Sequence, residues 1–137
     1  GRWGTKKIRE EAREILDSVG LADLASRRAG LLPLGNLRRL ELARALALRP
    51  KLLLLDESFS GLRAEEIRQM ALPVRAVRDA GMGVLLIEHN MKVAMALSER
   101  IVVLDHGRKL AEGTGAEVAA DSRVVEAYLG KGASGHA

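Results

Sequence analysis

The sequence contains no cysteine, which excludes disulfide bonds and thiolate metal sites. Aromatic residues are almost missing as well, since Trp3, Phe59 and Tyr128 are the only three. No apolar run approaches the roughly 20 residues that a membrane-spanning helix needs. We therefore expect a protein that is not itself membrane-spanning.

The net charge of +4 and the pI near 9.8 are compatible with a nucleic-acid partner. Two features argue against that partner. The basic residues are spread along the whole chain, and three aromatic residues provide no platform on which bases could stack. We expect no nucleic-acid binding and interpret the charge as a solvated basic surface, or one that faces ATP and acidic partners.

Apolar residues at helical spacing predict four main helices, at residues 7–19, 36–48, 64–78 and 91–98. Three short apolar runs predict buried strands, at residues 52–55, 84–87 and 101–104. Asp105-His106-Gly107 predicts a hairpin turn into a further strand. Buried strands that alternate with amphipathic helices indicate an α/β fold with a mostly parallel sheet, helices covering both of its faces.

The strands begin only after residue 48, which suggests three parts. Residues 1–48 are expected to form a helical subdomain and residues 49–130 the α/β core. Residues 131–137, rich in Gly, Ala and Ser, are expected to form a flexible tail.

The strongest local signal is the pair of acids that follows residues 52–55. Asp56 and Glu57 would lie at the carboxyl end of a parallel strand, where open α/β sheets bind their ligands. One carboxylate could hold Mg²⁺ and the other could orient or deprotonate a water molecule. The alternative is a strand that simply ends in solvated acids.

A second signal follows the strand at residues 84–87. His89 comes 32 residues after Glu57, the length of one βαβ unit, so a right-handed crossover would bring both to the same sheet edge. An imidazole at that edge could donate a hydrogen bond to a terminal phosphate. The alternative is a histidine that caps the next helix.

These motifs, in this order, resemble a known family. Residues 30–46, which include Leu32-Pro33-Leu34-Gly35-Asn36, then Arg49-Pro50-Lys51 and residues 52–57, resemble the signature-motif helix and Walker B strand of ABC ATPases. Residues 87–91, Ile-Glu-His-Asn-Met, resemble the segment that carries the switch histidine of that family.

Towards the C-terminus, residues 111–114 and 124–130 are similar to the end of ATPase subunits from branched-chain amino-acid importers. The resemblance implies the C-terminal part of a P-loop NTPase domain. It also implies an importer ATPase that couples hydrolysis to transport, lies in the cytoplasm on the inner face of the membrane, and binds permease subunits.

The resemblance also implies roles for single residues. Asp56 would serve Mg²⁺, Glu57 would be the general base for the attacking water, and His89 would sense the γ-phosphate of ATP. A second ATPase subunit would complete the site. Its ATP would be contacted by the degenerate signature, Pro33, Leu34, Gly35 and Asn36, and by the interface loop that includes Ser60 and Gly61.

The departures from the family pattern matter equally. No G-x-x-x-x-G-K-[ST] phosphate-binding loop occurs in the sequence, so we expect ATP and Mg²⁺ to bind only with a missing N-terminal half, and the chain alone to be inactive. Pro33 stands where the family has a serine hydroxyl, and Arg63 where an acid or amide is common. Two alternatives therefore remain: a non-transport ABC ATPase, and a catalytically inactive interaction fragment.

Overall fold

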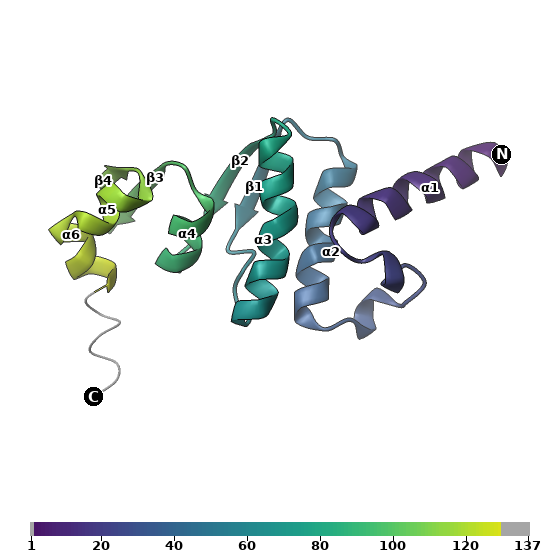
Figure 1. Cartoon of the computed structure of the whole chain (residues 1–137), viewed down its shortest axis with the longest axis horizontal. Helices are drawn as coiled ribbons and strands as arrows, with labels where there is room; N and C mark the ends of the chain where they lie inside the picture. The colour runs from purple at the N-terminus through teal and green to yellow at the C-terminus, as the bar shows by residue number, and fades with distance from the viewer. Residues whose placement is uncertain (1, 130–137) are drawn as a thin grey trace. The chain divides into compact units, whose positions relative to one another are not determined.

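The computed structural model describes residues 2–129 and has the expected α/β fold, with a parallel sheet and flanking helices (Figure 1). The chain divides into two compact units, Gly1–Leu85 and Leu86–Ala137. This division falls inside a strand, whereas the sequence suggests a boundary at residue 48. All elements before residue 49 are indeed helical, but the predicted subdomain boundary itself stays a prediction.

The first unit begins with two α-helices, α1 (Arg2–Ser18) and α2 (Leu34–Ala47), separated by the short 3₁₀ turns η1 (Ala22–Leu24) and η2 (Ala29–Leu31). Helix α1 ends where Gly20 adopts a left-handed conformation (φ 78°), which glycine accepts without steric cost. Near this end α1 packs on α2, and Val19, Leu21 and Leu42 are buried. Before residue 11, the described side chains of α1 are exposed.

Strand β1 (Leu52–Asp56), helix α3 (Ala64–Asp79) and strand β2 (Gly83–Ile87) follow, and β1 pairs with β2. Helix α3 continues through Pro73 and lies beside α2 (Figure 1). The expectation that both faces of this sheet are covered is wrong for β1. Leu53 and Leu55 are buried, but Leu52 and Leu54, on the other face of the strand, are 56% and 62% exposed.

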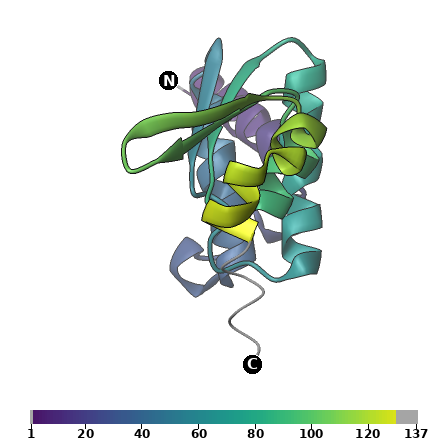
Figure 2. The same cartoon turned by 90° about the vertical axis from the view of Figure 1, so that its left-hand side faces the viewer.

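The second unit contains helix α4 (Met91–Leu97), strands β3 (Ile101–Asp105) and β4 (Arg108–Gly113), helices α5 (Gly115–Ala120) and α6 (Ser122–Val124), and a π-helical turn η3 (Val125–Leu129). The predicted hairpin is confirmed, since β3 and β4 pair antiparallel (Figure 2). The unit has its own small core, formed by Ala94, Ile101, Val103, Val118 and Val124.

Within residues 2–129, no helix is long and apolar enough to cross a membrane. The expected flexible tail, residues 131–137, lies outside the described residues.

Candidate functional site

The two candidate acids lie where the sequence places them, at the carboxyl end of β1. Asp56 is the last residue of the strand and Glu57 the first residue of the loop that follows, and both are exposed. The backbone of Glu57 is left-handed, with φ 53°. Such a conformation is strained for a residue with a side chain and is often found at functional sites. No pattern in the sequence predicts this conformation.

The loop after Glu57 is held in place by a turn and by an apolar anchor. The Ser60 N–H donates to the Glu57 carbonyl oxygen at 3.1 Å, and the Phe59 side chain is 4% exposed. Gly61 then takes a left-handed conformation, φ 78°. The acids and the interface loop, residues 60–63, are therefore one continuous structured segment.

The signature segment, residues 33–36, forms the start of α2. The sequence predicts that this helix begins at Asn36, but it begins at Leu34, with Pro33 as its N-cap residue. Pro33 has no side-chain oxygen to cap the helix, and its carbonyl accepts the first helical hydrogen bond from the Leu37 N–H at 3.0 Å. Gly35 is buried.

The structure brings the signature segment and the interface loop together within the first unit. A Cβ placed on Gly61 would lie 3.0 Å from Leu34 Cδ2, so the leucine packs against the glycine backbone. One turn along α2, the Arg38 guanidinium donates to the Ser60 carbonyl oxygen at 3.3 Å. The sequence names both segments separately, and their contact is a finding of the structure.

Glu66, in the first turn of α3, is the most informative residue that sequence reasoning missed. Its Oε1 accepts from the Arg63 backbone N–H at 3.2 Å and from Arg63 Nε at 2.9 Å, and its carboxylate lies against the backbone of Gly35. The Arg63 hydrogen bonds, foremost that from its guanidinium, lower the pKa of Glu66. Its position three residues after a helix N-cap was a usable signal for capping, but nothing in the sequence connects it to Gly35.

His89 belongs to the second unit, so its predicted pairing with Glu57 stays a prediction. The imidazole is 68% exposed, and its Nδ1 lies 3.6 Å from Oε1 of Glu88. The Glu88 side chain is only 2% exposed, and its Oε1 accepts the backbone N–H groups of His89 and Asn90 at 3.1 Å each. The alternative in which His89 caps the next helix is wrong. Asn90 is the cap, since its Oδ1 accepts from the N–H groups of Lys92 and Val93.

The acids at the end of β1 could supply part of the coordination shell of a magnesium ion whose other ligands are phosphate oxygens and water. Among residues 2–129, no group of three or more His, Asp or Glu side chains could enclose a metal. Mg²⁺ is commonly held by one or two carboxylates together with phosphate oxygens and water, and the exposed Asp56 could supply one such carboxylate.

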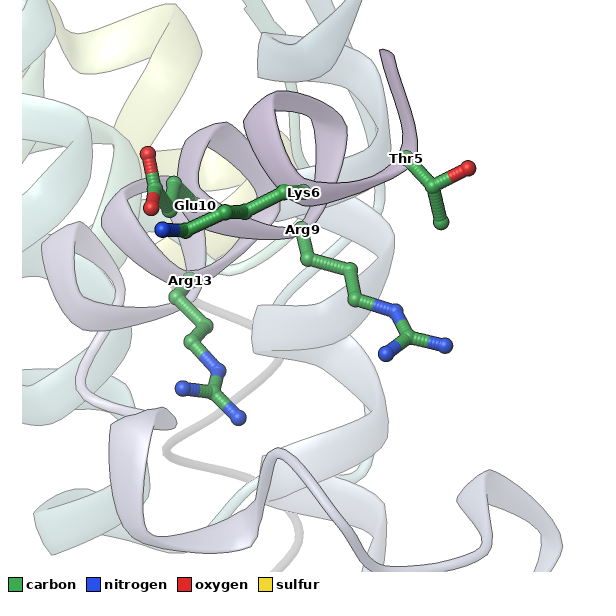
Figure 3. Close-up of a pocket in the computed structure, with 5 residues that line it drawn as sticks. All are labelled: Thr5, Lys6, Arg9, Glu10 and Arg13. Carbon is green, nitrogen blue, oxygen red and sulfur yellow. The ribbon is translucent and has the colours of Figure 1, made fainter. Parts of the chain in front are cut away.

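A shallow hollow of about 490 Å³ lies elsewhere, on the exposed side of α1 (Figure 3). It is lined by Thr5, Lys6, Arg9, Glu10 and Arg13, all from consecutive turns of this one helix. None of the predicted site residues contributes to it. It is a groove between solvated side chains and adds nothing to the candidate site.

Comparison with known proteins agrees with this geometry. Residues 3–60, which include the signature segment, Asp56 and Glu57, match the family model described as ABC transporter. Residues 108–134 match the model described as branched-chain amino acid ATP-binding cassette transporter. Over these two segments the chain is similar to ABC transporter ATP-binding proteins.

Curated relatives of this chain include branched-chain amino-acid transport proteins. It is 39% identical over 131 residues to the high-affinity branched-chain amino acid transport ATP-binding protein BraF of Pseudomonas aeruginosa, and it covers 51% of that protein. It is 38% identical to LivG of Salmonella typhimurium, of the same description, with 48% of that protein covered. The lipopolysaccharide export system ATP-binding protein LptB of Escherichia coli is 34% identical, with 51% covered.

Solved structures of ATP-binding cassettes are also similar to this chain. An ATP-binding cassette of an ABC transporter in its ADP conformation has a TM-score of 0.81 and 30% identity, over 88% of this chain and 49% of that one. A nucleotide-free cassette has a TM-score of 0.79, also at 30% identity. The chain thus spans about half the length of the relatives that it matches.

Proposed function

We propose that this chain contributes the signature segment, the Walker B acids and the switch histidine to the ATPase of an ABC importer for branched-chain or related amino acids. The observation that carries the proposal is the contact between the signature segment and the interface loop, next to the acids that end β1. The BraF and LivG relatives support the amino-acid substrate, and they outrank LptB in identity.

In this proposal each candidate residue has one task. Glu57 accepts the proton of the water that attacks the γ-phosphate, and Asp56 would hold Mg²⁺, which neutralises phosphate charge when bound. His89, exposed and fixed by the backbone bonds to Glu88, would donate to the γ-phosphate. The signature segment and interface loop would face the ATP of a second ATPase subunit, and permease subunits would hold the assembly at the inner face of the membrane.

The altered signature limits what this surface can offer a phosphate. Pro33 supplies neither a hydroxyl nor an N–H, and the Glu66 carboxylate lies against the backbone of Gly35. The start of α2 still has a favourable dipole. A signature segment of this kind therefore contributes less to the partner's site than one with serine at position 33.

The test is a chimera in which this chain replaces the matching half of Pseudomonas aeruginosa BraF, so that the BraF remainder supplies the other half of the cassette. We expect Mg²⁺-dependent ATPase activity, which falls at least about 100-fold in Glu57→Gln, because a neutral amide can hold the water but cannot take its proton. Glu65→Gln, an exposed acid on α3 that is paired with Arg68, is the matched control and should keep full activity.

Two results would overturn the proposal. One is a chimera that folds and binds ATP but hydrolyses it no faster than its Glu57→Gln variant. The other is a chain that hydrolyses ATP by itself, since the 137 residues contain no phosphate-binding loop sequence.

A further inference from the structure

One carboxylate connects the starts of two helices in the first unit. Gly35 is the second residue of α2, and its N–H is one of three at this helix start that have no acceptor within the helix, since Pro33 has no N–H. The Glu66 carboxylate lies against the Gly35 backbone and accepts the backbone N–H of Arg63, the N-cap residue of α3. Both helix N-termini carry partial positive charge, so an anion between them is well placed.

The absence of a side chain at position 35 allows this close approach. A Cβ on Gly35 would come within 3.2 Å of Glu66 Cδ and 3.3 Å of its Cγ, and closer still to Oε2. Any larger residue would have to push the carboxylate away from the start of α2. The Glu66 side chain is 20% exposed. The Arg63 guanidinium favours the ionised form of this carboxylate, so the pKa of Glu66 is lowered.

Two further contacts join the same segments. Leu34 packs on Gly61, and Arg38 donates to the Ser60 carbonyl oxygen. These contacts fix the signature segment against the backbone of the interface loop. The Glu66 contact differs from them because it also orients the N-terminus of α3, the helix into which the interface loop leads.

We propose that Glu66 is a positioning residue that holds the signature segment against the interface loop, so that the two respond to a bound partner as one element. This inference rests on the proposed function, in which both segments face the nucleotide of a second subunit. The simpler role would be local: Glu66 would stabilise only the first turn of α3.

The two roles predict different behaviour for the amide of Gly35, which is 31 residues from Glu66 in the sequence. The experiment is NMR on the 137-residue chain labelled with ¹⁵N, comparing wild type, Glu66→Gln, Glu66→Ala and the control Glu65→Gln. Glu65 lies in the same turn of α3 and has its own partner, Arg68. In the wild type we expect the Gly35 amide proton to shift as Glu66 titrates, and this pH-dependent shift should vanish in Glu66→Gln.

In Glu66→Ala we expect the Gly35 amide to exchange with solvent about fivefold faster or more, because the carboxylate that lies against it is gone, and the Gly61 amide to shift as Leu34 loosens. Glu65→Gln should leave both amides as in the wild type. A Gly35 amide that titrates unchanged in Glu66→Gln would overturn the proposal, and that variant decides the matter if Glu66→Ala does not fold. None of these readouts depends on ATP hydrolysis, so failure here and failure of the proposed function are distinguishable.

Discussion

Replacing Glu57 with glycine should give a more stable protein than replacing it with alanine, although both changes remove the proposed catalytic base. Glu57 has a φ of 53°, a left-handed conformation that costs a residue with a Cβ roughly 1–2 kcal/mol. Glycine avoids that cost but loses roughly 0.5–1 kcal/mol more conformational entropy on folding. The expected net gain over alanine at this position is about 0.5–1 kcal/mol.

Alanine is the right reference, because Glu57→Gly and Glu57→Ala both remove whatever the carboxylate contributes to stability. Urea unfolding followed by circular dichroism should give a midpoint about 0.3 M higher for Glu57→Gly than for Glu57→Ala. His106, also left-handed with φ 50°, sits in the exposed turn of the β3–β4 hairpin and should show the same order of glycine over alanine. Equal midpoints for the two Glu57 variants would refute the claim that this backbone is strained.

Three further outcomes follow from burial, capping and charge. Val124 is 0% exposed, so Val124→Ala should destabilise by about 2 kcal/mol in urea unfolding, whereas Val102→Ala, at a position 51% exposed, should change stability by less than about 0.5 kcal/mol. Asn90→Ala should cost about 1 kcal/mol by removing the cap of α4, and Asn90→Asp should restore most of it. Arg63 lowers the pKa of Glu66 in the folded state from its ordinary value of 4.5. The ionised Glu66 therefore contributes its full stabilisation above about pH 4.5, and this stabilisation is lost as the pH falls through the folded-state pKa. In Glu66→Gln, the free energy of unfolding should depend less on pH in this range.

Local patterns were sufficient to predict most elements of the fold. The hairpin turn at residues 105–107 follows from Asp-His-Gly, and the structure has positive φ angles at both His106 and Gly107, as a tight hairpin requires. The four leucines of residues 52–55 were harder. Four identical residues contain no alternation, so the sequence predicts a strand but cannot say that only Leu53 and Leu55 are buried.

The candidate site was predictable residue by residue but not as an arrangement. Motif order placed Asp56, Glu57 and the signature segment on the correct ends of their elements. The contact of Gly35 with Glu66 depends on how α2 packs against α3, and a sequence pattern contains no signal for that packing. The capping alternative at His89 has a different reason. Both His89 and Asn90 precede α4, but Asn90 lies directly before its first residue and asparagine is a preferred N-cap residue, so the sequence already favoured Asn90.

The exposed leucines of the sheet would contribute further free energy if another surface covered them. Leu52, Leu54 and Leu85 are each more than half exposed, so full burial of what remains would be worth about 1 kcal/mol for each, or about 3 kcal/mol in all. Small domains are typically stable by about 5–15 kcal/mol. Any surface that covers these three side chains would therefore raise the resistance of the first unit to unfolding by an appreciable fraction, and a single leucine-to-aspartate change there would weaken such an assembly while leaving the separate chain almost as stable as before.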